Sequence, residues 1–249
     1  MLATSARIIR DNWIYYLLMA LLIVVWETTD NLRPLGESTH TGAIGACVLL
    51  CARLPSVVLQ GGPLNMATAF KSPETLIIGF QVALIASILA GFMIYLEMNA
   101  YADLPHGAEL PIFDKLVLAG LLVIVQPMIV TFLGSWIPAG VMKKEPGFLL
   151  AIGRGFLSIH TVYWRLVLSL GASLLLSLLI IFVYMISFGS APSIVTPSGS
   201  IAPWSIVCWY LVSLVWLALL TYVNVVVCVC YARAEKIDLG AASRATEGG

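Results

Sequence analysis

Long apolar stretches recur along this chain and are separated by short polar segments. Each is about as long as the roughly 20 residues that a helix needs to cross about 30 Å of hydrocarbon. Backbone groups in lipid must be paired within the structure, and these runs are too long and continuous for barrel strands, so we expect helices. The expected membrane-spanning segments are residues 13–29, 42–60, 76–96, 115–137, 166–188 and 204–231.

Amphipathic segments precede three of these spans. Between residues 148 and 163, large apolar side chains recur every three or four positions, while Arg154, Ser158 and Thr161 lie away from that stripe. This pattern is typical of a helix lying in the membrane interface. We expect the helix to turn there into the following span. Shorter versions occupy residues 2–13 and 64–71.

The order of lead-in, outward span, outer loop and return span occurs three times. It predicts a three-fold hairpin repeat with units of about 1–62, 63–145 and 146–249. The alternative is that any hairpin membrane protein with basic inner loops shows the same order. Either way, the chain is expected to be an all-α polytopic membrane helix bundle. One transmembrane domain, 1–238, precedes a disordered cytoplasmic tail, 239–249.

Composition and charge agree with this membrane assignment. Hydrophobic residues make up 60% of the 249 residues and charged residues only 10%, against about 25% charged residues in soluble domains. With the N-terminus inside, most lysines and arginines fall on the inner side, which predicts that both termini are cytoplasmic. The net charge of zero gives no reason to expect nucleic acid as a partner. The expected partners are membrane lipids and another membrane subunit.

Two stripes of small residues predict close helix packing. Small side chains at every fourth position form a groove where a second backbone comes near, which is a main source of adhesion between helices in lipid. We therefore expect the third and fifth spans at the centre, and the first and sixth outside, since the sixth carries bulky Trp209 and Trp216. The stripes are Gly79, Ala83, Ser87 and Gly91, and Ser169, Ser173 and Ser177.

Polar residues inside the spans are the candidate functional residues. Arg53 lies two positions before Pro55, and Gln126 directly precedes Pro127. Proline frees a backbone carbonyl that a polar group or water can satisfy, so Arg53, Gln126, Gln81 and Asn224 would line a polar cavity or substrate path. The alternative is that the second span ends near Arg53, whose side chain reaches the cytoplasmic headgroups. Gln126 and Asn224 would then be hydrogen-bonding contacts between helices.

The chain carries none of the common catalytic signatures. The zinc-protease, nucleophile-elbow, Walker A and dinucleotide motifs are all missing. The five cysteines fall in apolar runs and read as buried side chains. The acidic loop from Glu97 to Asp114 matches no metal motif and reads as a solvated loop. We therefore assign no catalytic, cofactor-binding or metal-binding residue and expect a protein that is not an enzyme.

The basic amphipathic lead-ins, the proline-interrupted return spans and the cytoplasmic end YARAEKID together suggest a family. This layout resembles bacterial multi-pass proteins of the YciC-like group, and it is similar to the membrane region fused to some glycerophosphodiester phosphodiesterases. The resemblance implies a six-helix protein of the bacterial cytoplasmic membrane and carries over no catalytic residue. The expected function is a non-enzymatic accessory or scaffold protein of the envelope. The alternative is a small-solute or lipid transporter with a polar site around Arg53 and Gln126.

Overall fold

The fold is all-α in the part of the chain that the structure describes. The computed structural model describes residues 1–31, 41–60, 64, 78, 80–85, 87–88, 91–92, 95, 111–142, 147–195 and 200–237. These residues form helices and one isolated β-bridge between Val195 and Ile201. The predicted tail 239–249, Gly79 and residues 97–110 lie outside the described residues.

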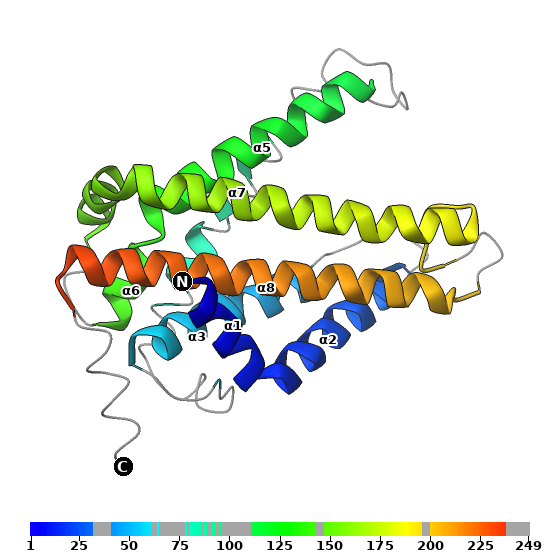
Figure 1. Ribbon diagram of the computed structural model, residues 1–249, viewed down its shortest axis with the longest axis horizontal. Helices are drawn as coiled ribbons and strands as arrows, with labels where there is room; N and C mark the ends of the chain where they lie inside the picture. Colours follow the sequence, from blue (N-terminus) through cyan, green and yellow to red (C-terminus); the bar gives the residue numbers. More distant parts are fainter. Residues whose placement is uncertain are drawn as a thin grey trace.

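The helices are arranged in tiers around one long antiparallel pair. In Figure 1, α7 and α8 run side by side along the longest axis; α1, α2 and α3 cover the side of α8 away from α7, and α5 leans outward from α7. The elements are α1 (Leu2–Asp11), α2 (Trp13–Asn31), α3 (Thr41–Gln60), α5 (Ile112–Leu133), α6 (Trp136–Val141), α7 (Phe148–Phe188) and α8 (Pro203–Ala234).

Three described stretches are long and apolar enough to cross a membrane: Val123–Val141, Phe148–Phe188 and Pro203–Ala234. The pair α1 and α2 would supply a fourth crossing, but its two helices meet at 81°. In α3, the part whose side chains are described is a shorter apolar helix, Leu50–Gln60. These features are compatible with an integral membrane protein, and they establish fewer crossings than the six expected.

Helix α8 lies at the centre of the described bundle, so the expectation that the sixth span lies outside is wrong. It packs against α1, α2, α3, α6 and α7. The residues from Asn224 to Cys228 are all buried, which at 3.6 residues per turn covers the full circumference of the helix. The tryptophans lie nearer the other end of α8, and the valines and cysteines of this segment allow neighbours to come close.

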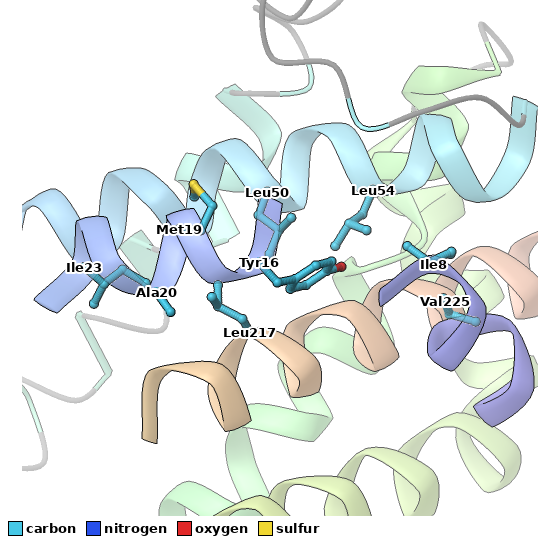
Figure 2. Packing of buried hydrophobic residues seen from close by; sticks show 9 residues of the cluster. All are labelled: Ile8, Tyr16, Met19, Ala20, Ile23, Leu50, Leu54, Leu217 and Val225. Atoms are coloured by element: carbon cyan, nitrogen blue, oxygen red, sulfur yellow. The ribbon is translucent and has the colours of Figure 1, made fainter. Parts of the chain in front are cut away.

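The main apolar cluster joins α1, α2, α3 and α8. Figure 2 shows Tyr16, Met19 and Ala20 of α2 between Leu50 and Leu54 of α3 and the surface of α8. Ala20, Leu50 and Leu54 have no exposed surface. The first and second expected spans are therefore packed against the sixth, and the second also packs against Ile78 and Val82 of the third.

Helix α7 is continuous, which corrects the predicted turn between an interfacial helix and the fifth span. It runs for 41 residues, or about 62 Å at 1.5 Å per residue. No proline interrupts this stretch, and the helix ends only at Gly189, whose φ of 71° needs a residue without a side chain. The bend expected here occurs at the N-terminus instead. There Asn12 ends α1, donating from Nδ2 to the Ile8 carbonyl at 2.9 Å.

Gly155 sets the approach of α5 to α7. A Cβ at this position would lie 2.7 Å from Phe132 Cα and 2.9 Å from the Thr131 carbonyl oxygen, both of them backbone atoms that cannot rotate away. Gly153, two residues earlier on α7, has no neighbour within 4 Å of the same position. Both glycines are inside α7, but only Gly155 is in contact with the backbone of α5.

We expect Gly155→Ala to lower the free energy of unfolding by about 1–3 kcal/mol, because the added methyl group forces the two backbones apart. Chemical unfolding in detergent micelles measures this change. Gly153→Ala is the matched control and should be neutral or stabilising by up to about 1 kcal/mol, since alanine is the better helix former. Equal effects of the two substitutions would show that α5 does not cross α7 at Gly155.

Candidate functional site

A buried hydrogen bond joins α2 to α8 beside the apolar cluster. The hydroxyl oxygens of Tyr16 and Thr221 are 2.6 Å apart, and Thr221 Oγ1 also donates to the Leu217 carbonyl at 2.9 Å. Because the threonine proton is directed to that carbonyl, Tyr16 is the donor in the bond between the helices. Both residues are buried, so this bond fixes the depth of α2 along α8.

Arg53 and Asn224 lie close to this hydrogen bond. Asn224 Nδ2 donates to the Leu220 carbonyl at 2.8 Å and reaches Cys51 Sγ of α3 at 3.5 Å. Arg53 is near enough to Tyr15 to act on it electrostatically. Tyr15 belongs to the first turn of α2, so Arg53 stands at the end of the α2 segment and not at its middle. The Arg53 side chain is half-buried and its Nε atom is buried, so both interpretations of Arg53 stay predictions.

Gln81 and Gln126 belong to other segments of the chain. Gln81 is only 2% exposed and packs against Gly140 of α6, where an added Cβ would meet Gln81 Oε1 at 2.8 Å. Gln126 is half-buried on α5, which packs mainly against α7. The four polar residues therefore come from α3, α5, α8 and the segment that holds Gln81, and the cavity that they would line stays a prediction.

The two stripes of small residues face different surroundings. Ala83, Ser87 and Gly91 are exposed, while Ile78, Gln81, Val82 and Ile85 form the buried face of their segment. The first stripe therefore does not pack against the described part of this chain. The second stripe faces α8: Ser177 is buried, and Ser169 and Ser173 are half-buried along the side of α7 next to α8.

A charged cluster at the C-terminal end of α8 is the strongest polar site that the sequence analysis missed. Arg154 of α7 donates to Glu235 Oε1 from Nε at 2.8 Å and from Nη2 at 2.7 Å. Its guanidinium also lies 5.2 Å from the ring centre of Tyr231, which is a favourable cation–π arrangement. No local pattern indicates this contact, because the two charges are 81 positions apart in the chain.

A small polar pocket adjoins this cluster. Arg154, Tyr231, Thr131, Ser135 and Ser158 line it. Within the described part of the chain, Arg154 Nη1 and the Tyr231 hydroxyl are buried and make no hydrogen bond. The free volume is about that of one water molecule, too small for an organic ligand. The cluster therefore fits a structural contact that holds α7 against α8 better than it fits a substrate site.

Comparison of the chain with protein-family models, with curated proteins and with solved structures finds no match.

We expect Glu235→Gln to lower the free energy of unfolding by about 1–3 kcal/mol, because it leaves the Arg154 charge largely buried without its counter-ion. The side chains of Arg154 and Glu235 are 14% and 25% exposed. The matched control is Asp11→Asn, since Asp11 pairs with Arg10 but these side chains are 51% and 77% exposed. That substitution should cost at most about 1 kcal/mol. Chemical unfolding in micelles compares the two, and an equal loss would contradict the account.

Proposed function

We propose that this chain is a multi-pass integral membrane protein of the bacterial cytoplasmic membrane and that it acts as a non-enzymatic accessory or scaffold protein. The proposal rests on one observation: polar side chains inside the bundle form hydrogen bonds between helices. The hydrogen bonds of Tyr16, Thr221 and Asn224 join helices to each other, as expected for contacts that hold a membrane bundle together.

The proposed topology has six spans, with both termini in the cytoplasm. Three apolar stretches and the α1–α2 pair account for four of these spans, while α3 and the segment 76–96 would supply the others. Residues 166–188 of α7 carry no charge and extend about 34 Å, which matches the hydrocarbon thickness. Arg154 and Arg165 would then lie at the cytoplasmic boundary.

The proposal keeps the three-fold hairpin repeat only as an order of segments along the chain. Its first unit begins with a lead-in helix bent by 81° from its span, whereas the lead-in of its third unit continues straight into α7. The units would share the order of their segments and the side on which basic residues gather. The resemblance to six-helix proteins of the bacterial inner membrane supports the same number of spans.

A transporter would need a polar path that water or solute reaches. Two of the four residues proposed for such a path lie on helices with different neighbours. Arg53 belongs to α3, which packs on α2, α6 and α8, and Gln126 belongs to α5, which packs on α7. Their positions support the scaffold proposal over the transporter.

Labelling of single cysteines in intact membranes tests this proposal. In a chain whose native cysteines are replaced by serine or alanine, we expect Gln126→Cys to resist a small aqueous thiol reagent from both sides. We expect Arg53→Cys to react from the cytoplasmic side at most, because the position lies at the end of a span. Reaction at both positions from one side would contradict the scaffold proposal and support an aqueous path.

Two further positions control the sidedness of the reagent. Arg10→Cys lies on an exposed part of α1 and should be labelled only from the cytoplasm. Ser190→Cys lies just after α7 and is exposed, and it should be labelled only from outside. Labelling of both from the same side would contradict the proposed topology.

A further inference from the structure

An apolar groove of about 680 Å³ runs between α7 and α8, within the range of about 300–1,000 Å³ that small-molecule sites occupy. Small side chains create it: Ser169, Ala172 and Ser173 on α7 face Ala218 on α8. The Ser169 hydroxyl donates to the Leu166 carbonyl of its own helix at 3.0 Å, so its proton does not point into the groove. The walls therefore suit a hydrocarbon chain.

One end of the groove carries positive charge. Arg165 lines it and is exposed, and its guanidinium approaches the sulfur of Met1. Among the described residues, no carboxylate forms an ion pair with Arg165; Asp11 is paired with Arg10 and Glu235 with Arg154. The planar guanidinium presents several donors, and such groups bind phosphate oxygens in pairs.

The depth of the groove matches one leaflet of a bilayer. The groove is lined on α7 by residues from Arg165 to Leu176. Over these residues the helix rises by about 16 Å. Half of the roughly 30 Å hydrocarbon core is about 15 Å. Arg165 is also the last charged residue before the uncharged stretch 166–188. The groove therefore starts at the level of the headgroups and ends near the middle of the membrane.

We infer that this groove binds one anionic glycerophospholipid of the inner leaflet, with an acyl chain between α7 and α8 and the headgroup phosphate on Arg165. The inference goes beyond the proposed function, because a scaffold protein acts with or without a resident lipid. The alternative occupant, a helix of a second copy, is disfavoured by charge. A second copy in the same orientation would bring its own basic end, with Arg7, Arg10 and Arg233, beside Arg165.

Native mass spectrometry of the full chain in detergent tests the inference with two probes that share the same acyl chains. These are dioleoyl phosphatidylglycerol and dioleoylglycerol, which lacks the phosphate. We expect a one-to-one adduct with the phospholipid and binding of dioleoylglycerol that is about tenfold weaker or more, since the charge-assisted contact is lost. Equal binding of the two would overturn the phosphate contact.

Substitutions locate the adduct. Arg165→Gln should weaken phosphatidylglycerol binding about tenfold, and Ala172→Trp should abolish it by filling the groove. The matched controls are Arg7→Gln, an exposed cation outside the groove, and Leu175→Trp, an exposed position on α7 that does not line it. Both controls should bind as the unmodified chain does. Ala218→Trp fills the groove from α8 and replaces Ala172→Trp if circular dichroism shows that the latter has lost helix.

Each other outcome overturns the inference in a specific way. If Arg7→Gln weakens binding as much as Arg165→Gln, the lipid is held by general surface charge. If neither tryptophan in the groove has an effect, the acyl chain lies elsewhere. If the unmodified chain forms a dimer that either tryptophan abolishes, the groove belongs to a second copy. Because the labelling of Gln126→Cys does not depend on a bound lipid, failure here leaves the proposed function standing.

Discussion

Five consecutive buried residues, Asn224–Cys228, require that α8 be enclosed on every side. Helices in lipid gain little from burying apolar surface against each other, so they associate by close contact and by hydrogen bonds between polar groups. The valines and Cys228 keep this segment of α8 slim, and Asn224 contributes a polar contact to α3. Five of the other described helices, α1, α2, α3, α6 and α7, are placed by their contacts with α8.

Two polar contacts join the helices at the end of the bundle where this enclosed segment lies. The bond from Tyr16 to Thr221 sets the depth of α2, and the pair of Arg154 with Glu235 ties the first half of α7 to the end of α8. Farther along, where α7 carries no charge, the outward side of the helix exposes large apolar residues such as Leu178, Phe182 and Ile186. The bundle is therefore held by charges near its basic end, whereas at the other end of α7 and α8 the hydroxyls of Tyr184 and Ser205 form an uncharged hydrogen bond of 2.7 Å.

The positions of most helices could be predicted from the sequence, because long apolar runs and proline positions are local signals. The packing order could not. Bulky Trp216 suggested that α8 lies outside, yet the segment that decides its place begins eight residues later, at Asn224. The stripe at Ala83 and Ser87 looked like a packing surface, but these residues are exposed and the opposite side of the segment is buried.

The candidate site shows the same division between local and distant information. Arg53 and Asn224 are candidates because a polar residue in an apolar run stands out. The partnership of Arg154 with Glu235 was missed because each residue alone looks like an ordinary charge near the membrane surface. Only the fold brings them within 2.7 Å. The groove between α7 and α8 likewise depends on the register of two helices, which neither sequence segment contains alone.

Oxygen accessibility of spin labels in lipid bilayers tests the central place of α8 most directly. Labels placed one at a time at residues 224–228 should all show low accessibility to oxygen dissolved in the lipid, because every side of the helix is covered. Labels at Leu178, Leu179 and Phe182 on the exposed side of α7 provide the high reference. A regular rise and fall along residues 224–228 that reaches the level of that reference would show that one side of α8 faces lipid and would contradict the account.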